Sequence, residues 1–189
     1  MAKYELTDNY FETIDTPEKA YWLGFIAADG CVSKRGALRV SIKDKDHLLK
    51  LKTALASTAK IRQYNRAGRE NPCYTFAAHR KKMCDDLTAH GVGPNKTMKL
   101  TPWVGPADLM SHYWRGTIDG DGWVTDESDK KGHHTSRYTV ALCGNKAMVE
   151  GLQQFVHNRI GINVKPIQYA EEKYNEPFFH VAYTGTYYP

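Results

Sequence analysis

Two aspartates occupy matching places in a short repeated motif. Residues 21–30 and 113–122 both read Tyr-Trp-x-Gly-x-Ile-x-x-Asp-Gly, so Asp29 and Asp121 stand at the same position of their copies. Paired carboxylates can hold divalent cations such as Mg²⁺, which activate water and neutralise the charge of a phosphate. This pair is therefore the first candidate for chemistry in the chain.

Each copy of the motif is typical of a helix that ends at its aspartate. Thr16 suits the N-cap, Pro17 suits the first helical position and Gly30 suits the residue just past the end. The second helix is expected to begin near Pro106 and to end at Gly122. One repeat unit is about half the chain, which favours a pseudo-two-fold molecule over a solenoid.

Small residues on these helices predict that the two helices pack against each other. Gly24 and Ala28 in one copy, and Gly116 and Gly120 in the other, lie four residues apart and share a face. Such spacing allows two helix backbones to approach closely. In a parallel pair the two aspartates would meet at the helix C-termini, where the helix dipoles and their like charges are unfavourable. A divalent cation bound between them would resolve that conflict.

The two stretches resemble the paired motifs of the LAGLIDADG homing endonucleases, in the single-chain form that carries both copies. The resemblance implies an α+β fold of two pseudo-symmetric αββαββα-type halves, with saddle-shaped antiparallel sheets and the motif helices at the centre. It also implies a site-specific endonuclease that cuts both strands of double-stranded DNA at a long, asymmetric target and acts as a monomer. The metal would be held by Asp29 and Asp121 together with the carbonyls of Ala28 and Gly120. Mg²⁺ is expected, and Mn²⁺ or Ca²⁺ could occupy the same sites.

The first half beyond its motif predicts a sheet with one apolar face and one basic face. Residues 38, 40 and 42 are apolar and alternate with polar residues, and a second hairpin over 61–66 and 73–79 extends the polar row. The alternation fits a sheet that tracks a DNA groove and fits a solvent-exposed face equally well. The residues of this half expected to contact DNA are Arg39, Ser41, Lys43, Arg62, Tyr64, Arg66 and Thr75.

Two further helices and a basic loop complete the first half. Asp46 is expected to cap one helix, and the other is expected over about 80–90. Lys96 follows and aligns with the basic residue that the family places near the scissile phosphates; the alternative is an exposed loop lysine. The expected division is an N-terminal half over 1–100, a linker over 101–106 and a C-terminal half over 107–189.

The second half repeats this pattern with a longer first hairpin. His133 and His134 fall at its tip, where the lack of a third nearby ligand favours a polar turn over a metal site. In the strand that follows, Tyr138 is expected to face inward, while Arg137 and Thr139 are expected to face DNA. This face is less basic than that of the first half, so the two halves should read different half-sites.

The second half also departs from the pattern of the first. A helix over 145–159 and a strand over 177–183 are expected, but no counterpart of the helix at 80–90 or of Lys96 follows, so this half should be shortened. Arg115 stands where the first motif has Leu23, and we expect its stem to be packed and its head to reach a polar partner.

Composition narrows the class of protein. A formal net charge of +5 and a pI near 8.9 permit nucleic-acid binding without requiring it. The four cysteines lack metal-ligand spacing and are expected to be reduced thiols. The sequence shows neither a signal peptide nor an apolar run of membrane-spanning length. We therefore expect an intracellular protein, cytoplasmic, nucleoid-associated or organellar, that is not secreted and has no membrane partner.

Three functions remain open at this stage. The first is the metal-dependent DNA endonuclease. The second is a non-cleaving nucleic-acid binder on the same scaffold, such as an intron maturase or a transcriptional regulator. The third, an unrelated carboxylate metalloenzyme acting on small molecules, fits the basic alternating strands poorly.

Overall fold

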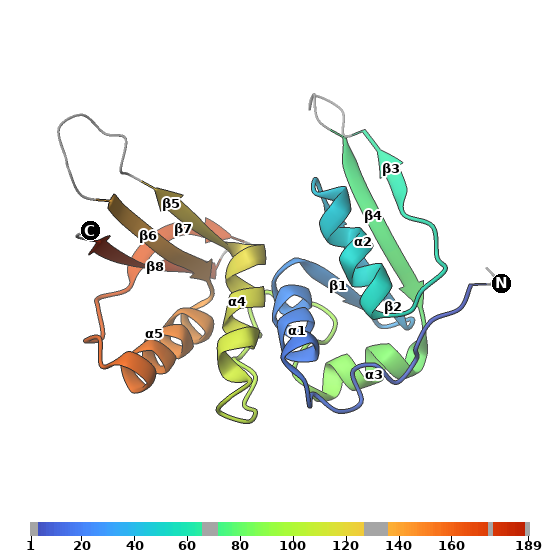
Figure 1. Ribbon diagram of the computed structural model, residues 1–189, viewed down its shortest axis with the longest axis horizontal. Coiled ribbons are helices and arrows are strands. Elements are labelled where there is room, and N and C mark those ends of the chain that lie inside the picture. Colours follow the sequence, from blue (N-terminus) through green and yellow to red (C-terminus); the bar gives the residue numbers. More distant parts are fainter. Residues whose placement is uncertain (1–3, 66–71, 127–135, 174–175, 188–189) are drawn as a thin grey trace.

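The computed structural model describes residues 4–65, 72–126, 136–173 and 176–187. Over these residues the chain forms two four-stranded antiparallel sheets and five helices, an α+β architecture (Figure 1). The predicted fold class is confirmed.

The first half builds one sheet in the order β1-β2-β4-β3, with every neighbouring pair antiparallel. Its first hairpin turns at Gly36, whose φ of 74° lies in the left-handed region that glycine adopts without strain. The elements are α1 (Pro17–Asp29), β1 (Gly30–Ser33), β2 (Ala37–Ile42), α2 (Lys45–Ala54), β3 (Arg62–Tyr64), β4 (Cys73–His79) and α3 (Lys81–Ala89).

The second half repeats this plan with the sheet order β5-β6-β8-β7. Within the described residues it ends on β8, without a counterpart of α3. Strand β7 was not predicted, because its run of charged residues lacks the apolar alternation by which strands are recognised. The elements are α4 (Met110–Asp121), β5 (Gly122–Asp126), β6 (Ser136–Gly144), α5 (Lys146–Ile160), β7 (Gln168–Lys173) and β8 (Glu176–Tyr187).

The start of α1 is as predicted, whereas two other helix starts differ. Thr16 caps α1 by accepting a hydrogen bond from the backbone N–H of Lys19 at 3.2 Å. Helix α2 is capped by Asp44, which accepts from the backbone N–H of His47 at 3.0 Å, and not by Asp46. Helix α4 begins at Met110 and not near Pro106, because a turn precedes it.

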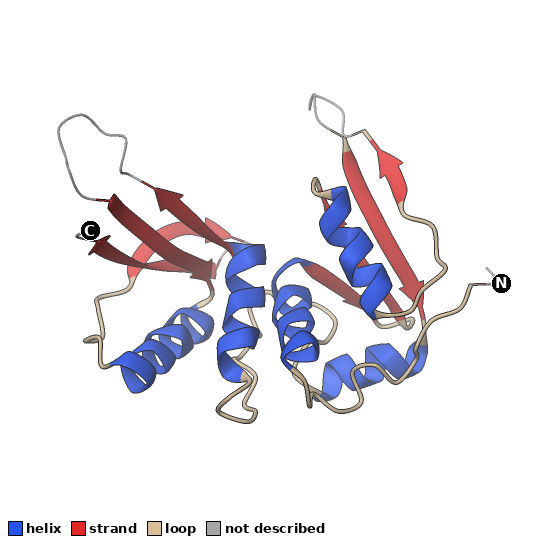
Figure 2. Cartoon of the chain, in the orientation of Figure 1, coloured by secondary structure: helices blue, strands red, loops and turns tan. Residues whose placement is uncertain are grey.

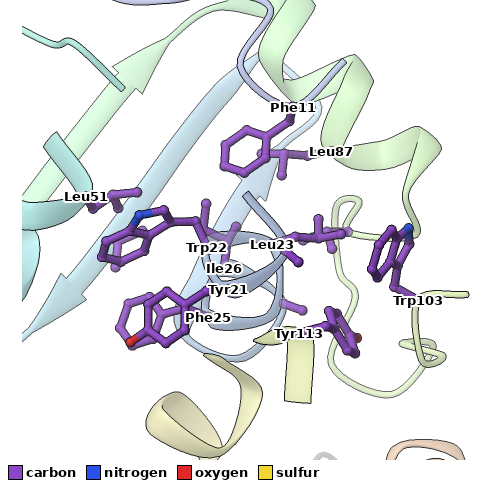
Figure 3. Close-up of a cluster of buried hydrophobic side chains, with 14 of the residues drawn as sticks. Phe11, Tyr21, Trp22, Leu23, Phe25, Ile26, Leu51, Leu87, Trp103 and Tyr113 are labelled. Carbon is purple, nitrogen blue, oxygen red and sulfur yellow. The ribbon is translucent and has the colours of Figure 1, made fainter. Parts of the chain in front are cut away.

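One hydrophobic core runs through both halves and is centred on the motif helices (Figure 3). Trp22, Phe25 and Ile26 of α1 are buried in it. Trp103, which lies between the halves, joins the same core, with its ring centroid 5.8 Å from that of Tyr113.

Asn145 ties the end of the first half to the second half. Its side chain is buried and accepts from the backbone N–H of Met148, so it caps α5. Its amide donates to the carbonyls of Thr97 and Leu100, at 3.1 and 2.9 Å. A single residue thus satisfies backbone groups on both sides of the junction.

Tyr138 corrects the prediction that it faces the core, since it is 45% exposed. By strand register Val140 is the counterpart of the buried Leu38, so Tyr138 lies two residues beyond it and corresponds to Gly36 in the first hairpin turn. Helix α3 contacts β2 in the first half, whereas the described residues of the second half include no counterpart of α3.

The two sheets diverge from the central helices, with the C-terminal ends of α1 and α4 between them (Figure 1). Helices α2 and α3 contact the first sheet and α5 contacts the second (Figure 2). The faces that these helices cover bear buried residues such as Leu38 and Leu142, and the opposite faces bear Arg39 and Thr139. We call these opposite faces the groove faces. None of the described helices has the length and apolar content that a membrane crossing requires.

Candidate metal centre and nucleic-acid interface

The two motif helices pack backbone against backbone, as the small residues predict. A Cβ at Gly24 would lie 2.0 Å from the carbonyl oxygen of Tyr113, and one at Gly116 would lie 2.0 Å from that of Tyr21. Further along, a Cβ at Gly120 would lie 2.4 Å from the Cβ of Ala28. These contacts advance in the same direction on both helices, so α1 and α4 run parallel.

Thr117 adds a polar contact to this interface that sequence reasoning did not identify. Its side chain is buried, and its hydroxyl lies 3.1 Å from the carbonyl oxygen of Tyr113 and 3.5 Å from that of Gly24. Threonine next to the motif glycine therefore packs closely and still satisfies its hydroxyl within the helix pair.

The parallel packing brings Asp29 and Asp121 together at the two helix ends. Gly120 immediately precedes Asp121, and a Cβ added to Gly120 would lie 3.5 Å from Oδ2 of Asp29. Desolvation and then the negative charge of Asp121 raise the pKa of Asp29 to about 6, and the charge of Lys96 opposes this rise. The two carboxylates therefore form a site that favours an added positive charge.

Lys96 reaches this site from the loop that follows α3. Its ammonium donates hydrogen bonds to the carbonyl oxygens of Ala27 and Ala28, the latter at 3.0 Å. Burial lowers the pKa of Lys96, while the negative charges of Asp121 and Asp29 raise it. The lysine thus lies within the field of both carboxylates and is not an exposed loop residue.

The oxygen ligands at this site suit a hard divalent cation. Mg²⁺ is commonly held by one or two carboxylates, with water and phosphate oxygens completing its shell. The described residues contain no cluster of three His, Cys, Asp or Glu side chains that could hold a metal. Asp29 and Asp121, with the carbonyl of Gly120, therefore fit a cation that takes its other ligands from water or a bound phosphate. The carbonyl of Ala28 also accepts from Lys96, so its second lone pair is the one available to a metal.

The groove face of the first sheet gathers most of the residues predicted to contact DNA. One hollow on this face is lined by Arg39, Ser41, Arg62, Tyr64 and Thr75. The hydroxyls of Ser41 and Thr75 lie 2.9 Å apart across paired strands. The predicted row is therefore assembled on one surface.

A second hollow extends from this surface to Asp29. It is lined by Asp29, Ser41 and Lys43, and Ser41 also belongs to the first hollow. Lys43 therefore lies where the basic face meets the candidate metal site. In the second half, Thr139 lies on the groove face with its hydroxyl 3.0 Å from that of Thr184.

Four of the positions discussed above cannot be placed in this way. Arg66, His133 and His134 lie outside the described residues. For Arg137 only the backbone is described, where it pairs with Thr186 across β6 and β8.

A polar network beside the helix ends was not predicted. The Tyr21 hydroxyl donates to Oδ2 of Asp119 at 2.7 Å and lies 3.1 Å from Nε2 of His47. The guanidinium of Arg115, for which we predicted a polar partner, lies 4.8 Å from the centroid of the Tyr21 ring. The only sequence signal was that Asp119 replaces Ala27 of the first motif, and the partner of such an acid depends on how the halves dock.

Comparison with known proteins agrees with this architecture. Residues 16–84 match the family model described as a LAGLIDADG-like domain. This segment is therefore similar to a LAGLIDADG-like domain, and the whole chain shares the two-domain fold of LAGLIDADG proteins.

Three solved structures show how widely this fold is shared. Full-length DUF199/WhiA from Thermatoga maritima aligns with a TM-score of 0.55 and 15% identity, over 93% of this chain and 55% of that chain. The homing endonuclease I-WcaI, bound to its DNA recognition sequence, aligns with a TM-score of 0.54 and 14% identity, over 92% and 80%. The LAGLIDADG meganuclease I-AabMI, bound to uncleaved DNA, aligns with a TM-score of 0.50 and 12% identity, over 90% and 79%.

These likenesses establish the fold and leave the activity open. The chain spans about half the length of the WhiA protein, and the fold is common to WhiA and to homing endonucleases. No curated protein matches the chain.

Proposed function

We propose that this protein is a site-specific endonuclease that hydrolyses both strands of double-stranded DNA with Mg²⁺ held by Asp29 and Asp121. The observation that carries the proposal is the meeting of these two carboxylates with Lys96 at the ends of adjacent parallel helices. A binding scaffold alone has no need to hold two acids where helix dipoles and like charges disfavour them.

Each residue of the site has a role in phosphodiester hydrolysis. A bound divalent cation supplies an activated water and neutralises charge on the phosphate. Asp29 and Asp121 would hold the cation, with the carbonyls of Ala28 and Gly120 as further ligands. Lys96 would orient water and offset the negative charge that develops on the phosphate.

The groove faces supply affinity and position. Arg39, Arg62 and Lys43 would neutralise phosphates, which makes binding dependent on salt. Polar side chains such as Ser41 and Thr75 would contact base edges. I-WcaI and I-AabMI have this fold and are bound to DNA, which supports double-stranded DNA as the partner here.

We propose further that the chain acts as a monomer inside the cell and that the two halves each read one half-site. In this division residues 1–100 form one half, 107–189 the other and 101–106 the linker. Unequal groove faces imply a target without symmetry.

A non-cleaving DNA binder, such as a maturase or a transcriptional regulator, is the second candidate. It is favoured by one observation: the described residues of the second half offer no counterpart of Lys96. The fold itself does not separate the two functions.

Cleavage of supercoiled plasmid separates the two candidates. The plasmid carries a site first selected from a randomised duplex library by its binding to the protein. We expect linear product with Mg²⁺ and none with EDTA. The Asp29→Asn and Asp121→Asn variants should bind without cutting, whereas Asp108→Asn, an exposed aspartate before α4, should cut normally. Specific binding without cutting under any divalent metal would favour the second candidate.

A further inference from the structure

The two groove faces differ in chemistry at equivalent sheet positions. Residues paired across strands share a face, so the pairing defines each surface. Arg39, paired with Cys31 on β1, corresponds to Ala141, which is paired with Trp123 on β5. By the same register Arg62 on β3 corresponds to Gln168 on β7. These two cationic residues of the first sheet are thus replaced by uncharged ones in the second.

The described side chains on the groove face of β5, β6 and β8 carry little charge. They include no lysine, arginine, aspartate or glutamate; the side chain of Arg137, which we predicted to face DNA, lies outside the described residues. The accessible side chains described on this face are Trp123, Thr125, Thr139, Cys143, His180, Ala182 and Thr184.

Trp123 is the largest side chain on this surface. It is 40% exposed although it lies two residues from Asp121, and its ring centroid is 5.9 Å from that of His180. Opposite it on β6, Ala141 is fully buried. The indole therefore forms an apolar contact surface next to the candidate metal site.

The threonines of this face carry methyl groups beside their hydroxyls. The hydroxyls of Thr139 and Thr184 lie 3.0 Å apart, so one donates a hydrogen bond to the other. Each also has a γ-methyl, and the neighbouring Ala182 ends in a methyl. The described part of this surface lacks the forked donors that recognise guanine in the major groove.

We infer that the second sheet reads thymine C5-methyl groups, so that its half-site is rich in A·T pairs. The inference rests on the proposed function, because it assumes that this face lies on duplex DNA. A β-ribbon fits the major groove, where thymine alone among the bases presents a methyl group, and apolar contacts from Ala and Thr methyls are its usual partners. The first sheet, with Arg39 and Arg62, reads its half-site by charge and hydrogen bonding instead.

The test uses the full chain and a randomised duplex library, with binding as the selection. The Arg39→Ala variant identifies the half-site of the first sheet, because selection relaxes there. Each thymine of the other half-site is then replaced by uracil, which removes only the methyl group. We expect thymine to be enriched in the second half-site, and each replacement at a contacted thymine to weaken binding about fourfold.

Two variants identify the protein residues that contact the thymine methyl groups. Thr139→Ser keeps the hydroxyl but removes the methyl, and should abolish the thymine–uracil difference, meaning the difference in binding affinity between thymine and uracil, at one position. Trp123→Ala should abolish it at the position nearest the cleavage centre. The matched control Thr53→Ser, on an exposed site of α2, should leave the difference intact.

Every outcome decides the inference. If no sequence is enriched, both the proposed function and this inference are overturned. If a site is enriched but its second half-site lacks thymine or tolerates uracil, this inference alone is overturned. Retention of the thymine–uracil difference in Thr139→Ser and Trp123→Ala would assign the effect to other residues and also contradict it.

Discussion

At the scale of single residues, the site is defined by two carboxylates that lie close together at the C-terminal ends of helices, where negative charge is unfavourable. Asp29 has a pKa of about 6 because desolvation and Asp121 both disfavour its ionised form. Lys96 compensates in part, since its ammonium lies against the carbonyls at the end of α1. A site of this kind binds cations at the expense of fold stability.

The loss of fold stability that ionised Asp29 causes can be measured in metal-free buffer. The pKa of Asp29 is about 6 in the folded state, above its ordinary value of 3.8. The folded protein is therefore most stable below about pH 4, where Asp29 is protonated, and loses stability as the pH rises through about 6. We therefore expect Asp29→Asn to raise the free energy of unfolding at pH 8 by about 1 kcal/mol, reduced for partial exposure of the carboxyl.

Urea denaturation of the parent and the variant at pH 4 and pH 8 provides the measurement. The gain should disappear at pH 4, and Asp108→Asn should show no such dependence. A variant less stable than the parent at pH 8 would mean that the ionised carboxylate is stabilised in the fold, contrary to this account.

Lys96 should matter for cleavage more than for binding. We expect Lys96→Met to lower the cleavage rate about 100-fold, as is usual when a group that stabilises transition-state charge is removed. The affinity for DNA should change little, because the ammonium lies against the end of α1. Single-turnover cleavage and filter binding measure the two effects, with exposed Lys99→Met as the control. Equal activity of the Lys96 and Lys99 variants would remove Lys96 from the site.

At the scale of elements, the close approach of α1 and α4 places the carboxylates. The glycines permit this approach, and their role is steric, since none of those in the interface has a positive φ. Gly30 follows the same rule: its φ is −79°, and a Cβ there would lie 2.5 Å from Cγ2 of Ile26. In both motifs glycine is therefore required because a Cβ would overlap neighbouring atoms.

Gly24→Ala should therefore destabilise the protein strongly. The added Cβ would overlap the carbonyl of Tyr113, and overpacking of this kind costs about 1–3 kcal/mol or more. Gly185→Ala, where nothing lies within 4 Å of the new Cβ, should cost less than about 0.5 kcal/mol. Guanidinium denaturation compares the two, and a Gly24→Ala variant as stable as Gly185→Ala would show that the helices do not pack this closely.

The sequence predicted those elements whose signals are local or repeated. The motif helices follow from Thr16, Pro17 and the glycine spacing, and the alternation at residues 38–42 predicts β2. Strand β7 was not predicted, because its charged residues do not alternate with apolar ones. Asp44 and Asp46 are equally suitable caps in composition, and only the position of α2 against the sheet decides between them.

At the scale of the whole molecule, the two halves are alike in fold and unequal in surface. The repeat made the pseudo-symmetric architecture predictable, along with the meeting of the aspartates. Contacts that depend on how the halves dock were not predictable, such as Tyr21 with Asp119 and Asn145 with the segment before α4. The exposure of Tyr138 was missed because its alternation alone cannot reveal whether a helix covers it.

Because the described cationic side chains lie on the groove face of the first sheet, we expect the salt dependence of DNA binding to come mainly from that sheet. Neutralising one phosphate contributes about −0.9 to the slope of log K against log salt concentration. We expect Arg39→Ala to weaken DNA binding and to make the slope less negative by about one unit, because Arg39 lies on the groove face. Lys50→Ala, exposed on α2, should leave the slope unchanged, and equal slopes for both variants would place DNA elsewhere.

The most direct test of the shared metal site is a Mn²⁺ titration, followed by electron paramagnetic resonance, of the protein bound to its selected DNA. If Asp29 and Asp121 hold the cations jointly, each aspartate-to-asparagine variant should lose at least tenfold in Mn²⁺ affinity, and the double variant should lose less than the product of the two effects. Parental Mn²⁺ affinity in either single variant would contradict the account.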